Sequence, residues 1–165
     1  MNGVPAHVLI VHAVVVLIPL SAFLVLLTVL WPAARAKLGF ITPLTVLLAL
    51  GCIPLATSAG EWLQERLPST PQIQRHVQMG DALSVWAFLL FVIAALYWLI
   101  PFAAERGWKV PTFALAKWVQ PALGAVAVVL AVVSVVQVYR IGDSGAKAAW
   151  HGKVSSTAIN GGDNG

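Results

Sequence analysis

Four histidines carry the most versatile side-chain chemistry in this sequence, and all of them stand at or near the ends of long uncharged stretches. They are His7, His12, His76 and His151. A neutral imidazole can ligate haem iron or another transition metal. The histidines are therefore the first candidates for a functional site, provided that the fold brings them together.

His12 lies deepest in apolar sequence, well inside the first uncharged stretch. A polar side chain at that depth normally faces neighbouring helices rather than lipid. We therefore expect His12 inside a helical bundle, either as a ligand of haem or a metal, or as a hydrogen-bond partner of another helix. His7 is displaced from His12 by about 140° around a helix, so the two cannot chelate one ion from one face.

His76 is the expected partner of His12 across the bundle. Gly80 and Ser84 share its helical stripe, where small residues would leave room beside the imidazole for a close helix or a flat cofactor. For the cofactor, we consider haem b, with two histidines as axial or metal ligands and two arginines near the haem propionates. The candidate cofactor-binding residues are His12, His76, Arg75 and Arg140, of which His12 and His76 are the candidate metal ligands.

The elements that must position these residues follow from four stretches without Asp, Glu, Lys or Arg: residues 1–33, 38–60, 82–104 and 118–139. A helix of 22 residues, the length of the shortest stretch, covers about 33 Å, and the hydrocarbon core of a bilayer is about 30 Å thick. The composition agrees, with 59% hydrophobic residues, 10% charged residues and a mean hydropathy of +0.87. Apolar runs without alternation fit helices rather than barrel strands.

We predict an all-α fold, an antiparallel bundle of four transmembrane helices in a lipid bilayer. The expected spans are about residues 8–31, 39–60, 80–104 and 117–139, within one membrane domain of residues 1–154. A polar, disordered tail is expected over residues 155–165. Four crossings bring all four histidines to the same side of the membrane.

The connections carry local signals of their own. Residues 32–37 indicate a tight turn between the first two helices, and residues 142–145 indicate a turn after the last one. Ser69 or Thr70 could cap the third helix, with Pro71 in its first turn.

The basic residues give an orientation. No Lys or Arg precedes the first helix, whereas Arg35 and Lys37 follow it closely, and the first helix often dominates orientation. We therefore predict a multi-pass protein of the plasma membrane with both termini extracytoplasmic. The sequence pI near 9.7 comes from few residues at helix ends, which suits lipid headgroups and not nucleic acid.

Several functions are disfavoured. The spans hold no carboxylate for proton or ion coupling, and the chain has no haem-attachment, zinc-protease or phosphate-loop motif. Ser144 lacks a partner base at a convincing place in the sequence, so an enzyme is not favoured.

The alternative to a haem- or metal-binding protein associated with redox chemistry is a non-catalytic, structural or accessory subunit of a larger membrane complex. Trp86 or Trp98 would then contact other subunits.

Short motifs at the helix ends resemble the bacterial membrane family described as domain of unknown function 2231. They extend over about residues 3–151 and comprise His7-x-x-x-x-His12 after Gly3-Val4-Pro5, Thr57-x-x-Gly60, Arg75-His76, and Arg140-Ile-Gly-Asp-Ser-Gly-Ala-x-Ala-Ala-Trp150. The resemblance implies a four-helix protein of the bacterial inner membrane with a suspected redox or haem connection. The sequence departs from the family pattern at Val8, at Ala13-Val14 and at Asp143, and the last departure removes a possible ligand.

Overall fold

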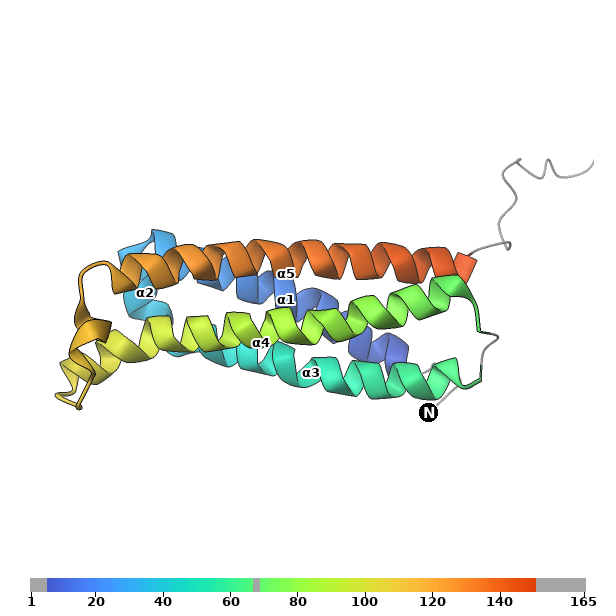
Figure 1. The fold of residues 1–165 in the computed structure, drawn as a ribbon, viewed down its shortest axis with the longest axis horizontal. Helices are drawn as coiled ribbons and strands as arrows, with labels where there is room; N and C mark the ends of the chain where they lie inside the picture. Colours follow the sequence, from blue (N-terminus) through green and yellow to red (C-terminus); the bar gives the residue numbers. More distant parts are fainter. Residues whose placement is uncertain (1–5, 67–68, 151–165) are drawn as a thin grey trace, which may run out of the picture.

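The computed structural model describes residues 6–66 and 69–150, and all of the regular structure in this part of the chain is helical. The elements are α1 (Ala6–Leu30), α2 (Pro32–Leu38), α3 (Ile41–Gln64), α4 (Pro71–Glu105), the 3₁₀ helix η1 (Thr112–Leu115) and α5 (Val119–Trp150). Four of the described helices, α1, α3, α4 and α5, are long and apolar enough to cross a membrane. The predicted all-α, antiparallel four-helix bundle is confirmed (Figure 1). His151 and the predicted tail lie outside the described residues.

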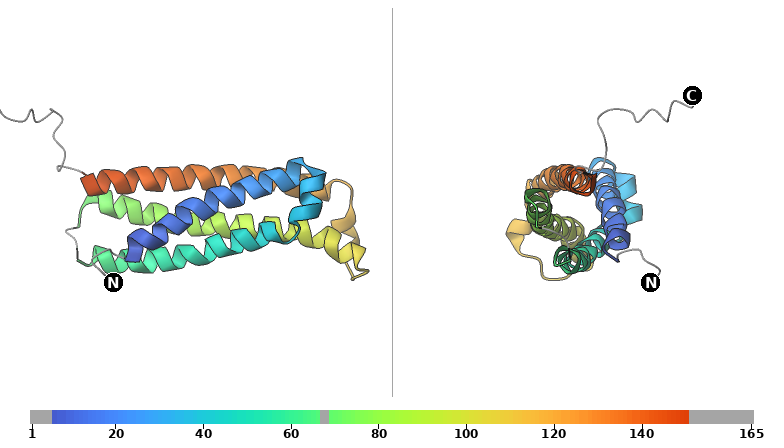
Figure 2. Two further views of the ribbon diagram at one scale, coloured as in Figure 1. Left: turned by 180° about the vertical axis from the view of Figure 1, so that it is seen from behind. Right: turned by 90° about the vertical axis from the view of Figure 1, so that its right-hand side faces the viewer.

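The four long helices form a ring in the order α1, α3, α4, α5. Helix α1 packs on α3 and α5, and α4 packs on the same two helices, so α1 and α4 lie diagonally across the bundle (Figure 2). This arrangement determines which helices can share a site. Side chains of α4 and α5 meet directly, whereas those of α1 and α4 face each other only across the core.

The core consists largely of alanine and branched aliphatic residues. One cluster holds Val14, Ile18, Ala49, Ile53, Ala56, Leu83, Ala87 and Val138, and the other holds Ala22, Val25, Val46, Leu90, Ala94, Ala127, Leu130 and Ala131. Small side chains allow helix backbones to approach closely where lipid supplies no hydrophobic driving force for association. Ala127 and Ala131, one turn apart on α5, provide such a small-residue contact, because both are buried in the second cluster.

Residues 32–37, expected as a tight turn, instead belong to the short helix α2. Pro32 occupies the first turn, where its missing N–H costs nothing, and Gly39 ends the helix with a φ of 43°. The third long helix begins at Pro71 as expected. Of the two predicted caps, Thr70 is the one used, and its hydroxyl accepts a hydrogen bond of 3.3 Å from the Ile73 N–H.

Residues 142–145, also expected as a turn, are helical, because α5 continues to Trp150. Two local interactions support this extension. The Ser144 hydroxyl donates to the Ile141 carbonyl at 2.8 Å, and Lys147 pairs with Asp143 at 2.6 Å, one helical turn away. Gly142 and Gly145 are therefore part of helix α5 and not of a turn.

Helices α4 and α5 are longer than a membrane requires. Their 35 and 32 residues correspond to about 52 and 48 Å, against a hydrocarbon core of about 30 Å. The excess lies largely in residues 71–81 of α4 and 140–150 of α5. These two segments lie at the same end of the bundle and hold the charged residues of α4 and α5 at that end. This part of the α4–α5 pair is thus suited to the headgroup region and the water beyond it.

Candidate functional site

One end of the bundle, which we call the histidine end, holds the first turns of α1 and α4 and the last turns of α3 and α5 (Figure 1). His12 on α1 and His76 on α4 both lie toward it, as expected from four crossings. The side chain of His7 and the whole of His151 lie outside the described structure. The candidate site is therefore built from His76, Arg75 and Arg140, and from the residues that the fold places beside them.

His76 forms a hydrogen bond with Ser144 of the neighbouring helix α5. The imidazole Nδ1 and the Ser144 Oγ are 3.0 Å apart. The Ser144 hydroxyl also donates to the Ile141 carbonyl, with Oγ 2.8 Å from that oxygen. The contact orients the imidazole and does not activate the hydroxyl.

A glycine on α5 makes room for this imidazole. A Cβ atom on Gly145 would lie 3.0 Å from Cε1 of His76 and 3.3 Å from Nδ1. The stripe on α4 itself does not play the expected part, since a Cβ atom on Gly80 would meet nothing within 4 Å. The space beside His76 is therefore supplied by the neighbouring helix.

Replacing Gly145 with alanine tests this arrangement. We expect the added methyl group to displace the ring and to break the bond to Ser144, so the imidazole ¹⁵N resonances of His76 should shift from their positions in the unsubstituted protein. Gly142→Ala is the matched control, because a Cβ atom there meets nothing within 4 Å. Identical imidazole spectra for the two variants would contradict the assigned packing.

A cavity of about 160 Å³ lies beside this pair, between the first turns of α4 and the last turns of α5. Its walls bring together two of the predicted site residues, Arg75 and Arg140, with the Ser144 that bonds His76. The full lining is Gln72, Arg75, Met79, Arg140, Asp143, Ser144 and Lys147. Three cations and one carboxylate line the cavity, so it is positively charged.

The ion pairs leave the two guanidinium groups of this cavity uncompensated. Asp143 is the carboxylate of the lining, and Lys147 already pairs with it at 2.6 Å. None of the ion pairs within residues 6–66 and 69–150 involves Arg75 or Arg140. Both arginine side chains are exposed, which allows a soluble group or a lipid headgroup to reach them.

His12 is placed differently from the expectation. Its side chain is exposed on the outside of the bundle, not turned into it, and its helix lies diagonally from the helix of His76. The core side of α1 at this level is occupied by Val14 and Ile18, which pack in the first core cluster. The structure therefore brings together His76, Arg75 and Arg140, while His12 stands apart from them.

These positions do not fit a haem held between His12 and His76. The cavity near His76 is smaller than the roughly 300–1,000 Å³ typical of sites for drug-sized ligands. His76 is also directed to α5 by its bond to Ser144, and α1 is not its neighbour. Among the described residues, no three His, Cys, Asp or Glu side chains gather as a metal site would require.

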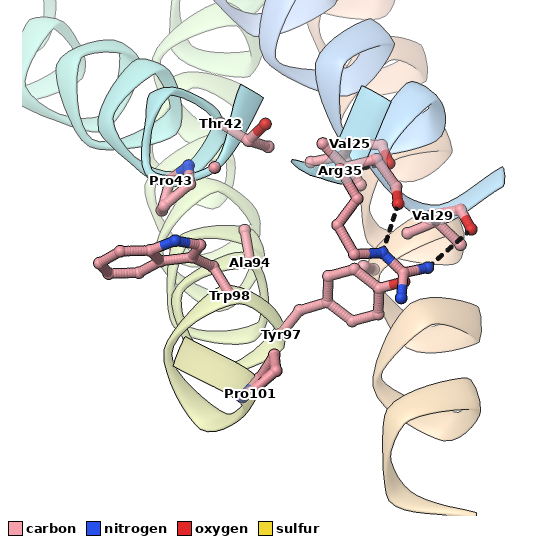
Figure 3. Close-up of a pocket in the computed structure, with 12 residues that line it drawn as sticks. Val25, Val29, Arg35, Thr42, Pro43, Ala94, Tyr97, Trp98 and Pro101 are labelled. Carbon is pink, nitrogen blue, oxygen red and sulfur yellow. Dashed lines mark hydrogen bonds between the residues drawn. The ribbon is translucent and has the colours of Figure 1, made fainter. Parts of the chain in front are cut away.

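The opposite end of the bundle contains a second polar feature, which no motif in the sequence indicates. Arg35 of α2 folds back on α1, where Nε donates to the Thr28 carbonyl at 3.0 Å and Nη2 to the Val29 carbonyl at 3.3 Å (Figure 3). Its guanidinium carbon lies 4.8 Å from the centroid of the Tyr97 ring. A basic residue just after a span predicts orientation, but nothing in the sequence predicts that this side chain turns inward.

Together these observations define a class, a helical multi-pass membrane protein with a positively charged site at one end. Comparison with known proteins finds no matching family model, no matching curated protein and no matching solved structure. The resemblance to the family described as domain of unknown function 2231 therefore stays a prediction from short motifs.

Proposed function

We propose that this protein is a multi-pass membrane protein that binds a negatively charged group at its histidine end, in the cavity between α4 and α5. The observation that carries this proposal is the pair of guanidinium groups, Arg75 and Arg140, that neighbouring helices place on one cavity. The carboxylate of that cavity, Asp143, is already paired with Lys147. Guanidinium groups bind carboxylate and phosphate oxygens through two parallel hydrogen bonds.

The remaining walls complete such a site. The Ser144 hydroxyl and the Gln72 side chain add polar groups beside the two arginines, and Met79 adds an apolar one. The bond between His76 and Ser144 joins α4 to α5 at this level and holds the two walls together. A ligand here would be bound and positioned, since the hydroxyl of Ser144 is engaged with a backbone carbonyl.

Substituting the two arginines tests the proposal. With inorganic phosphate as the probe, isothermal titration of the full chain in an uncharged detergent should show binding that Arg75→Gln and Arg140→Gln each weaken about tenfold. A hydrogen bond to a charged group is worth about 1.5–3 kcal/mol, and about 1.4 kcal/mol corresponds to a factor of ten.

Arg66→Gln is the matched control for these variants. Arg66 follows α3 at the histidine end, but its guanidinium stacks over Trp62 at 3.8 Å and pairs with Glu65 at 3.5 Å, outside the cavity. Its substitution should leave phosphate binding unchanged. Absence of binding in the unsubstituted protein, or equal losses in all three variants, would contradict the proposal.

A haem- or metal-binding protein with a redox role is the finer alternative, and the geometry supports it less well. Arg75 and Arg140 could face propionates, but the helices of His12 and His76 lie diagonally across the bundle and are not neighbours. An absorption spectrum after expression with ample haem separates the two proposals. A Soret band that His76→Ala abolishes and Arg66→Gln preserves would overturn the anion-binding proposal in favour of a haem site.

A non-catalytic accessory subunit is a related proposal that uses the same surface, with an acidic side chain of a partner in place of the small anion. The exposure of Arg75 and Arg140 supports it. The two tryptophans expected as partner contacts are half-buried. Within this chain Trp86 packs against the second core cluster, and Trp98 stacks on Phe102 with the ring centroids 4.9 Å apart. Purification from native membranes in mild detergent tests this proposal, since recovery without a companion subunit counts against it.

We further propose a bacterial plasma membrane as the location, with both termini extracytoplasmic. The support is the basic pair Arg35 and Lys37 directly after the first span, with no Lys or Arg before it. The histidine end would then face away from the cytoplasm.

A further inference from the structure

A second cavity lies at the end of the bundle opposite to the histidine end, enclosed by all four long helices and by α2. It has a volume of about 50 Å³ (Figure 3). Most of its wall is apolar, from residues such as Val25, Ala94 and Pro101, and three residues with polar groups stand out, Arg35, Thr42 and Trp98. None of the twelve lining residues is Asp or Glu.

Thr42 supplies a hydroxyl that has no hydrogen-bond partner. Its side chain is only 4% exposed, and its Oγ1 makes no hydrogen bond within the described structure although it lies in the wall of the cavity. A buried hydroxyl without a partner costs about 1–3 kcal/mol, so such groups normally signal a bound water or ion. The polar hydroxyl of the other lining threonine, Thr28, is already bonded to the Val25 carbonyl at 3.0 Å.

The start of α3 adds a second source of positive potential. Thr42 lies in the first turn of this 24-residue helix, and no side chain caps that turn. The first N–H groups of a helix lack internal partners, and the helix dipole makes this end equivalent to about half a positive charge. Anions bind readily at such ends.

Arg35 brings a full positive charge to the same cavity. Its Nε and Nη2 are held by the Thr28 and Val29 carbonyls, and no hydrogen bond of the described residues engages Nη1. The Tyr97 ring below the guanidinium fixes its plane. Arg35 therefore adds a cationic side chain to the lining of a cavity that also contains the unpartnered hydroxyl of Thr42.

We propose that this cavity binds a small monovalent anion of the size of chloride. A water molecule needs about 10–15 Å³ of such volume, so a cavity of about 50 Å³ holds a few waters or one small anion. Its lining includes the side chains of Arg35 and Thr42, and a guanidinium and a hydroxyl can both donate to an anion. The apolar walls suit a weakly hydrated halide better than a strongly hydrated cation.

This site is independent of the one proposed at the histidine end, because the two lie at opposite ends of the bundle. It also gives a role to Arg35 beyond its contact with α1. A bound anion would link α2 to the first turn of α3, which are joined in sequence only through Gly39 and Phe40.

Exchange of chloride for a large anion tests the proposal. The full chain, purified in an uncharged detergent, is titrated with sodium chloride against sodium gluconate at constant ionic strength, and the Tm and the ³⁵Cl NMR linewidth are followed. We expect a saturable rise in Tm and a broadened chloride line for the unsubstituted protein. Thr42→Val, which keeps the shape of the side chain, should weaken chloride binding about tenfold or more, since it removes a hydrogen bond to a charged group.

The controls distinguish chloride from water and from lipid. Thr45→Val is the matched control. Thr45 lies about one turn further on α3, is half-buried, and already donates to the Ile41 carbonyl at 2.8 Å, so this variant should respond to chloride as the unsubstituted protein does. Arg75→Gln should also leave the chloride response intact. If the cavity is empty or filled with water, Thr42→Val should be at least as stable as the unsubstituted protein in both salts, and neither protein should respond to chloride. This result would overturn the proposal. A response to anionic phosphatidylglycerol but not to chloride would overturn it as well.

Discussion

An Arg35→Ala variant is expected to lose about 2–4 kcal/mol of unfolding free energy in detergent micelles. The substitution leaves the Thr28 and Val29 carbonyls without the donors that now lie at 3.0 and 3.3 Å. These carbonyls belong to the last turn of α1, where the helix dipole is negative and a cation is favourable. The contact with the Tyr97 ring is lost at the same time. Reversible denaturant unfolding, followed by circular dichroism, measures the loss.

Lys37→Ala separates the contacts of Arg35 from a general effect of charge or helix propensity. Lys37 lies on the same short helix and is exposed, so its substitution should change the unfolding free energy by no more than about 0.5 kcal/mol. Arg35→Lys should fall between the two, since a lysine keeps the charge but lacks the planar fork that reaches both carbonyls. Equal losses for Arg35→Ala and Lys37→Ala would show that Arg35 does not anchor α2 to α1.

The sequence predicts the architecture of this protein well, for a physical reason. A bilayer requires about 20 consecutive apolar residues per crossing and full internal hydrogen bonding, and only helices meet both demands without pairing to other segments. The four uncharged stretches therefore indicate four helices, and their even number indicates that His12 and His76 lie toward one end. These conclusions need no knowledge of how the helices pack.

Rotation of each helix about its axis cannot be predicted in the same way. Helix α1 is apolar on nearly all sides, so its sequence does not indicate which side faces the core. The expectation that His12 points inward relied on the cost of a polar group in lipid, and the exposed position of His12 shows that another side of α1, with Val14 and Ile18, packs in the core. A lone polar residue near a helix end is therefore a weak guide to which side of that helix faces the core.

The site residues that the sequence did not reveal are those defined by a neighbouring helix. The Gly-Asp-Ser-Gly segment at 142–145 has the composition of a turn, and only its packing on α4 shows that Ser144 bonds His76 and that Gly145 accommodates the ring. Spacing along one chain does not give the register between two helices. Arg75 and Arg140 were recognised by charge alone, and the structure adds the cavity that they share.

Replacing Ala131 with leucine is expected to cost about 1–3 kcal/mol of unfolding free energy, measured by the same denaturant titration. Ala131 is completely buried on α5, in a cluster to which all four long helices contribute, and its small side chain lets the backbones approach closely. Ala131 lines neither of the two cavities described above, so the three added carbon atoms require α5 to move away from its neighbours or the leucine to adopt a strained rotamer.

Val132→Leu is the matched control for the same helix. Val132 is 52% exposed on the side of α5 that faces lipid, where an additional methylene contacts acyl chains or detergent as favourably as valine does, so the change should stay within about 0.5 kcal/mol. The two variants place the same leucine side chain at adjacent positions of α5, one facing the core and one facing lipid, although Ala131→Leu adds three carbon atoms and Val132→Leu adds one. Equal unfolding free energies would mean that α5 is rotated from its described orientation, which would also remove Ser144 from His76 and Arg140 from the proposed anion site.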